Sequence, residues 1–388
     1  MKKILVGAIV LALGAGAQGF AQSLEDLNIQ IHGYATQGFL YTTNNNILTT
    51  HSSDGSPAWT EAVLNVGASP ISKLRIGVQG RFFLLGNFGN TISLDWAAAD
   101  YKVDDRLGFR FGKVKTPSGL FNDIQDIDPS YIWSLLPQSI YTISNRDGVL
   151  AHYGAVAYGT FSEGGKLGKL EYRGWAGNRR VSGDDGYFVV QTEAGIVLPN
   201  GFSAVTSGVT LRWVTPLKGL MIGVTGARNN MSVSKLTAGG GALNGSETVF
   251  AVNQPSFFAR YEKNKVMVAS EYTRLPGQVN IGFSGLPPSP NTRFDYKEWY
   301  AMASYKLTGK LTAGIYDSQQ FNRQAALGPA RYSKDWTFSG RYDFSQYLYA
   351  KAEEHFIDGT AIGYDTDLNP NGLKPNTKLT ILKVGVSF

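Results

Sequence analysis

The sequence predicts an all-β fold, a closed antiparallel barrel of sixteen strands that spans a membrane. Three observations predict it: an amino-terminal export signal, short segments in which apolar and polar residues alternate, and a last strand that ends in an aromatic residue. Such a barrel points alternate side chains toward lipid and toward a polar lumen, with tight turns at one end and longer loops at the other.

The amino terminus has the three parts of a secretory signal peptide. Lys2 and Lys3 supply the positive charge, residues 4–13 are apolar, and residues 19–21 form a small-x-small cleavage site. We therefore expect residues 1–21 to be a signal peptide and residues 22–388 to form the barrel, with cleavage after Ala17 as the alternative. Beyond this signal, no stretch holds the roughly 18 consecutive apolar residues that a membrane-spanning helix needs.

Composition excludes several other classes of protein. Without Lys2 and Lys3, 34 basic residues face 30 acidic ones, and the basic residues form no stripe or helix of the kind that binds nucleic acid. The chain has no cysteine, so it can form neither a disulfide nor a thiolate metal site. A closed hydrogen-bond ladder needs neither, because closure leaves no exposed sheet edge.

Alternation with a period of two marks the strands. In residues 107–111 the apolar Leu107, Phe109 and Phe111 share one face, and residues 74–82 repeat the pattern. We assign the apolar face to lipid and the other face to the lumen. The inward face then carries four arginines on the third and fifth strands: Arg75, Arg81, Arg106 and Arg110.

Counting such segments gives the order of strands along the chain. The sixteen predicted strands are residues 27–42, 59–68, 72–84, 90–101, 106–114, 148–161, 168–177, 205–215, 219–227, 248–262, 264–274, 294–307, 310–318, 332–344, 346–357 and 376–388. Tight turns alternate with long connections at 43–58, 115–147, 228–247, 275–293, 319–331 and 358–375. Residues 178–204 are interpreted as a loop because that preserves the alternation; a strand pair there would raise the count to eighteen.

The carboxyl end places an aromatic residue after apolar residues at every second position. Thr380, Leu382, Val384, Val386 and Phe388 share one face. This pattern resembles the outer-membrane assembly signal, which implies a bacterial outer-membrane location, contact with outer-membrane lipid, and recognition of Phe388 by the barrel-assembly machinery. The alternative is a lipid-facing closing strand that ends in phenylalanine by chance.

The segment after the fifth predicted strand carries a second resemblance. Residues 113–122, KVKTPSGLFN, are followed by LLPQSIY at 135–141 and NRD at 145–147. Together with the strand rhythm, these motifs resemble the Gram-negative outer-membrane general porins. The resemblance implies a water-filled channel for passive diffusion of small hydrophilic solutes and ions, without a cofactor and as a homotrimer. Residues 86–90 depart from it, because they are too few for the loop that latches over the neighbouring subunit in trimeric relatives.

The resemblance also implies a constriction. Loop 115–147 would fold into the lumen, where Asp123, Asp126 and Asp128 would face the four inward arginines and set up a transverse field that orients polar solutes. The alternative is an ordinary extracellular loop with solvated carboxylates. Trp133, Leu135 and neighbouring apolar residues favour the inward position, as does the rule that long loops are usually functional.

Aromatic residues on the outward face indicate membrane-interface girdles. These are Trp96, Trp213, Trp299, Trp336, Tyr172, Tyr261, Tyr305 and Tyr342. Three tyrosines, Tyr34, Tyr300 and Tyr316, fall on the inward face and leave open a sugar-stacking path inside the pore.

Two rival functions remain. A substrate-selective, anion-preferring channel would use the inward arginines as a binding ladder. An outer-membrane barrel hydrolase would need a catalytic pair, for which only His32 and His355 share inward parity on neighbouring parts of the barrel. No catalytic or metal-binding motif supports an enzyme or a metal site; Asp184, Asp185, Asp365 and Asp367 in outer loops are more simply solvated acids than calcium ligands.

Overall fold

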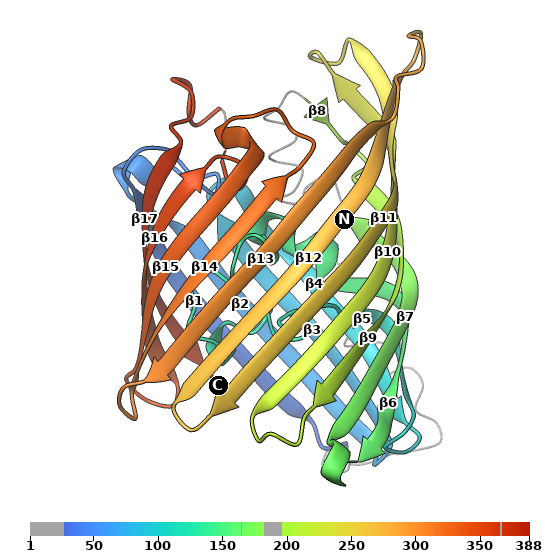
Figure 1. Ribbon diagram of the computed structural model, residues 1–388, viewed down its shortest axis with the longest axis vertical. Coiled ribbons are helices and arrows are strands. Elements are labelled where there is room, and N and C mark those ends of the chain that lie inside the picture. Colours follow the sequence, from blue (N-terminus) through green and yellow to red (C-terminus); the bar gives the residue numbers. More distant parts are fainter. Residues whose placement is uncertain (1–26, 164, 182–195, 365–366) are drawn as a thin grey trace.

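The barrel closes through pairing between its first and last strands (Figure 1). The computed structural model describes residues 27–163, 165–181, 196–364 and 367–388, so the predicted signal peptide lies outside the described residues. Strand β1 (Gln30–Thr42) pairs antiparallel with β2 (Ser56–Ile71) on one side and β17 (Asn376–Ser387) on the other. The remaining strands pair in chain order, except for β8 (Ile196–Val197), a two-residue strand added to β10 (Leu220–Ala238).

The predicted sixteen-stranded antiparallel barrel is confirmed, with β8 as one extra short strand. β7 (Lys169–Val181) pairs directly with β9 (Phe202–Val214), up to Val181 opposite Phe202, so no strand pair is inserted between them. The other strands are β3 (Leu74–Leu85), β4 (Phe88–Lys102), β5 (Gly108–Lys115), β6 (Ala151–Glu163), β11 (Leu243–Lys263), β12 (Val266–Phe283), β13 (Thr292–Lys306), β14 (Leu311–Asn322), β15 (Tyr332–Asp343) and β16 (Leu348–Gly359).

Among the described residues, helical structure is confined to single turns in the connections. They are η1 (Ser52–Asp54), η2 (Asp128–Ser130), η3 (Ile143–Asn145), α2 (Arg146–Val149), η4 (Gly165–Leu167) and η5 (Pro329–Arg331). No helix among the described residues is long and apolar enough to cross a membrane.

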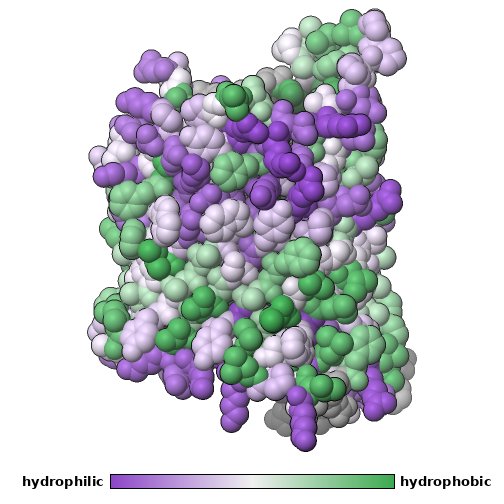
Figure 2. All heavy atoms as spheres, in the orientation of Figure 1, coloured by the Kyte–Doolittle hydropathy of each residue, from purple (hydrophilic) through white to green (hydrophobic). Residues whose placement is uncertain are grey.

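Side chains along the strands alternate between the lumen and the outer wall, as the sequence predicts. In β17 Thr377, Leu379 and Ile381 are buried inward, whereas Leu382 and Val384 are exposed on the outer wall. Figure 2 shows apolar residues gathered in a band over the lower half of the visible wall, nearer the short turns, with polar residues above it. A band of this kind matches the lipid-facing belt of a transmembrane barrel.

Strands β10, β11 and β12 rise beyond the rest of the rim, in yellow and light orange at the upper right of Figure 1. The prediction that residues 228–247 and 275–293 are loops is wrong for most of their length, since Met231 pairs with Val249 and Gly245 with Phe283. A separate apolar cluster that includes Val233, Leu236 and Val181 supports this projection. Strands outside lipid need no apolar outer face, so alternation does not reveal them.

Candidate functional site

The segment between β5 and β6, residues 116–150, crosses the barrel lumen and is here called the lumen loop. The inward side chains of distant strands hold it: the hydroxyl of Tyr34 on β1 donates to the carbonyl of Asp126 at 3.1 Å, and Thr210 on β9 donates to the carbonyl of Pro117 at 2.6 Å. Ser339 on β15 donates to the carbonyl of Ile132 at 3.3 Å. The predicted inward fold of this loop is therefore observed, and the ordinary extracellular loop is excluded.

One half of the lumen loop packs as a hydrophobic core against β11–β14. Trp133 and Phe121 are buried against Tyr300 and Tyr316, with the Trp133 and Tyr316 rings 5.1 Å apart and edge to face. Edge-to-face pairs add to the apolar area that aromatic rings bury. Tyr34, Tyr300 and Tyr316 do point inward as predicted, but the loop covers them, so they offer no stacking path to a solute.

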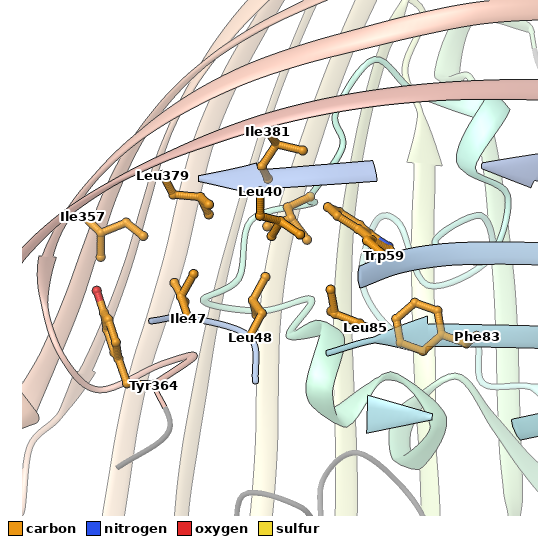
Figure 3. Packing of buried hydrophobic residues seen from close by; sticks show 11 residues of the cluster. Leu40, Ile47, Leu48, Trp59, Phe83, Leu85, Ile357, Tyr364, Leu379 and Ile381 are labelled. Atoms are coloured by element: carbon orange, nitrogen blue, oxygen red, sulfur yellow. The ribbon is translucent and has the colours of Figure 1, made fainter. Parts of the chain in front are cut away.

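A second apolar cluster fills the lumen near its outer end (Figure 3). Ile47 and Leu48, from the loop between β1 and β2, lie among Leu40, Leu379 and Ile381 of the wall. Leu135 of the lumen loop joins the same cluster. The side of the lumen lined by β16, β17 and β1–β3 is therefore occupied at this level by packed side chains.

Asp128 anchors the lumen loop to the last two strands. Its carboxylate lies 2.9 Å from both Lys351 on β16 and Lys383 on β17, and it accepts a hydrogen bond from Tyr349 at 2.7 Å. All of these groups are buried. Burial alone would raise the pKa of the Asp128 carboxyl, but the two ammonium groups outweigh it and hold that pKa well below its usual value.

Asp126 and Asp123 anchor the loop to the opposite wall. Asp126 pairs with Lys115 at 2.7 Å and accepts from Gln79 at 2.8 Å. Asp123 pairs with Arg173 on β7 and with Arg212 on β9, the latter at 3.2 Å. Burial opposes the charge on Asp123, but the two guanidinium groups lower the pKa of its carboxyl.

Five charged groups meet where the loop returns to β6. Arg81 pairs with Glu61 at 2.6 Å and with Asp147 at 3.2 Å. Arg146 pairs with Asp95 at 2.8 Å and also with Asp147 at 2.9 Å. Charges of both signs face one another here, which is the arrangement that generates a local transverse field.

The predicted acidic residues therefore lie inside the lumen, where Asp123 shares a cavity with Arg75 and Arg110 but forms its ion pairs with other residues. Arg81 contacts the loop through Asp147, and Arg110 pairs with Asp100 of β4 at 2.7 Å. Arg75 points into the lumen and lines a cavity described below. None of the three contacts Asp123, Asp126 or Asp128 through an ion pair in the described part of the chain.

The placement of Arg106 on an inward strand position is wrong. Strand β5 begins only at Gly108, because the Asp104 carboxylate accepts the backbone N–H groups of Arg106 and Leu107 at 2.7 and 2.9 Å and holds both residues in the turn. Arg106 is exposed at the short-turn end, away from the lumen loop.

The outward assignment of Trp96 is also wrong. Gln79 pairs with Trp96 but the next residue, Gly80, pairs with Leu94, so Asp95 is an extra residue in β4. Such a bulge shifts the alternation by one position. Trp96 therefore faces the lumen, where its ring lies 2.9 Å from the position a Cβ on Gly77 would take.

The two inward histidines lie near opposite ends of the barrel. His355 is opposite Leu379, which is opposite Thr42, and Thr42 is ten residues from His32 along β1. At ~3.3 Å per strand residue this places them about 33 Å apart along the strand. The pair that a barrel hydrolase would use is not formed. His355 instead lies between Asp335 and Glu353, at 2.9 and 3.2 Å.

The wall residues that hold the lumen loop were not singled out from the sequence: they are Lys351, Lys383, Arg173, Arg212 and Glu61. Lys383 was detectable, because it alternates with the outward Leu382 and Val384 and so had to face the lumen. What the sequence could not supply is which strands lie opposite each carboxylate of the loop.

An open space lies between the lumen loop and the short turns. A cavity of about 570 Å³ is lined by residues of β1–β5 and β7 and by Asp123. Within the loop region itself the cavity bounded by Glu61, Arg81 and Arg146 measures only about 40 Å³, room for a few water molecules. The charged residues of the lumen loop therefore leave less room between them than the cavity on the short-turn side offers. In the described part of the chain no group of three or more His, Cys, Asp or Glu could hold a metal ion.

Solved structures of outer-membrane proteins share this fold. The anion-selective porin from Comamonas acidovorans has a TM-score of 0.58 and 10% identity, with 93% of this chain and 99% of that chain covered. The OmpF of Salmonella typhi in complex with daunomycin has a TM-score of 0.56 and 13% identity, covering 95% and 99%. The trimer form of OmpT, an outer-membrane protein of Vibrio cholerae, has a TM-score of 0.56 and 12% identity, covering 93% and 99%.

No family model and no curated protein matches the sequence itself. The likeness is thus one of fold, and it confirms at that level the resemblance to Gram-negative outer-membrane porins. The barrel also agrees with the predicted outer-membrane location.

Proposed function

We propose that this chain is an outer-membrane porin through which small hydrophilic solutes and ions diffuse passively. The observation that carries the proposal is the lumen loop, which narrows the barrel and leaves a cavity of about 570 Å³ on its short-turn side. Charged groups of both signs, Arg81 and Arg146 with Glu61 and Asp147, line the narrowed level. A wetted, charged constriction of this kind filters solutes by size and charge and needs no cofactor.

Planar-bilayer recording of the purified full-length barrel in KCl tests this function. We expect stepwise, ohmic current that does not saturate as KCl is raised. The same preparation unfolded by heat is the control and should give no steps. Absence of current from protein whose folded state is verified by circular dichroism would overturn the proposal.

We propose that the barrel assembles as a homotrimer held by its walls. The turn between β3 and β4 spans only residues 86–87, and the backbone N–H of Asn87 donates to Thr49 of the same chain at 3.0 Å. This turn is therefore engaged within its own barrel and cannot reach a neighbour. Sedimentation in detergent should give a trimer, and a monomer at every protein concentration would overturn this point.

We propose that the chain is not an enzyme. The support is the separation of His32 from His355 and the position of His355 between two carboxylates that the barrel wall supplies. Ester and peptide substrates should be left intact by the folded barrel; hydrolysis that a His355→Gln variant loses would overturn this.

A further inference from the structure

The cavity on the short-turn side of the lumen loop has an unequal charge. Its lining includes four cationic side chains, Arg75, Arg110, Lys115 and Arg173, and two carboxylates, Asp100 and Asp123. We call this cavity the basic vestibule. Its volume of about 570 Å³ lies in the range of small-molecule sites, roughly 300–1,000 Å³.

Ion pairs satisfy three of these four cations. Arg110 pairs with Asp100, Arg173 with Asp123, and Lys115 with Asp126. The fourth, Arg75, makes no ion pair and no hydrogen bond within the residues that the structure describes, and its side chain is exposed to the cavity. A guanidinium presents paired N–H donors that match a carboxylate or phosphate with two parallel hydrogen bonds.

The residues beside Arg75 are of types that contact the uncharged part of a small organic solute. Gln30 and His32 on β1 and Asn65 on β2 supply neutral polar groups. The Trp96 ring supplies an apolar surface in the same lining. The vestibule thus combines one free cation, several polar groups and one aromatic face, which is the composition of a site for a small organic anion.

We propose that the basic vestibule binds small organic oxyanions as they pass, with Arg75 as the residue that contacts the anionic group. The inference rests on the proposed channel function and adds its solute class. Carboxylates and phosphate monoesters share the oxyanion chemistry, and the experiment below separates them.

The experiment measures current through the full-length barrel in planar bilayers at a fixed KCl concentration. Succinate, its neutral diamide and glycerol 3-phosphate are added in turn on the short-turn side. We expect succinate or glycerol 3-phosphate to reduce the chloride current in a saturable manner, and the diamide to leave it unchanged. Whichever oxyanion gives the lower half-saturating concentration identifies the preferred class.

Two variants test whether the saturable reduction of the chloride current depends on Arg75. Arg75→Gln should raise the half-saturating concentration about tenfold, which corresponds to about 1.4 kcal/mol. Arg106→Gln removes the same charge from an exposed turn outside the vestibule and should leave that concentration unchanged. Arg75 makes no ion pair or hydrogen bond in the described part of the chain, so its variant is expected to fold. Isothermal titration of the folded barrel with succinate gives a readout independent of current.

The outcomes separate the two proposals. Normal KCl current without saturation by either oxyanion overturns the vestibule site and leaves the porin function standing. Equal effects of the two variants, or saturation by the neutral diamide, also overturn it. Absence of KCl current overturns the channel function, whereas titration still reports on the site.

Discussion

The lumen loop meets the barrel wall in two different ways on its two sides. Toward β11–β17 it is sealed by Trp133 and its aromatic neighbours and by Asp128 between two fully buried lysines. Toward β7 and β9 it is held by the partly exposed pairs of Asp123 with Arg173 and Arg212, beside an open cavity. Buried pairs of Asp126 and Arg146 hold it to β3–β5 between these two sides. The first side fixes the position of the loop, and the second leaves the space through which a solute passes.

This contrast has an electrostatic basis. A buried charge is costly unless it is paired, and removal of one partner leaves the other uncompensated. A partly exposed pair is weak because water screens it, so its loss changes stability little and leaves mainly a change of local charge. The sealed side should therefore control stability, and the open side should control selectivity.

The largest effect is expected from Asp128→Ala. It leaves Lys351 and Lys383 buried without a counterion, which should lower the free energy of unfolding by about 3–5 kcal/mol. Chemical denaturation followed by circular dichroism measures this, and single-channel conductance should rise as the loop leaves the wall. Asp54→Ala, in an exposed loop position, is the matched control. Equal stability of the two variants would contradict a fixed, sealed side.

Lowering the pH should weaken the contacts of Asp128 gradually, whereas the Asp128→Ala substitution removes them at once. The folded pKa of Asp128 lies below its unfolded value of about 3.9, so its ionised form contributes stability at neutral pH. That contribution is fully present above this unfolded value and declines as pH falls toward the folded pKa. Denaturation midpoints measured from pH 7 to pH 3 should therefore begin to fall near pH 4. In Asp128→Asn this part of the pH dependence should be absent; a slope identical to that of the unmodified chain would rule out Asp128 as its source.

The smallest change in stability, about 0–1 kcal/mol, is expected from Asp123→Asn on the open side, because its pair with Arg173 is partly exposed. The substitution frees the charges of Arg173 and Arg212 beside the cavity. The reversal potential in a KCl gradient should consequently shift toward chloride. A shift toward potassium, or a stability loss as large as that of Asp128→Ala, would show that the two sides do not differ as described.

Most of the barrel could be predicted from sequence because alternation is a local signal. Each lipid-facing residue stands next to a lumen-facing one, so strands such as β16 and β17 are recognisable without knowledge of their neighbours. Two predictions of side-chain orientation are wrong for local reasons. The extra residue Asp95 reverses the parity of Trp96, and the turn at Asp104 removes Arg106 from its strand.

The candidate site was less predictable because it depends on positions around a closed ring. That Asp123, Asp126 and Asp128 enter the lumen follows from the loop motif, but their partners come from β5, β7, β9, β16 and β17. The path of 35 loop residues across the lumen decides which strand each carboxylate meets. No periodicity in the chain encodes that path.

The contact of Asp128 with Lys383 also links the position of the lumen loop to the closure of the barrel. The two residues are 255 positions apart, and β17 follows all the other described strands in the sequence. Contacts of such large separation form late, because the intervening chain must first be placed. Strand β17 consequently supplies both the pairing that closes the barrel against β1 and the lysine that holds Asp128 of the lumen loop. A chain truncated before Lys383 is expected to lose both, because one strand supplies the closing hydrogen bonds and the cation that holds Asp128.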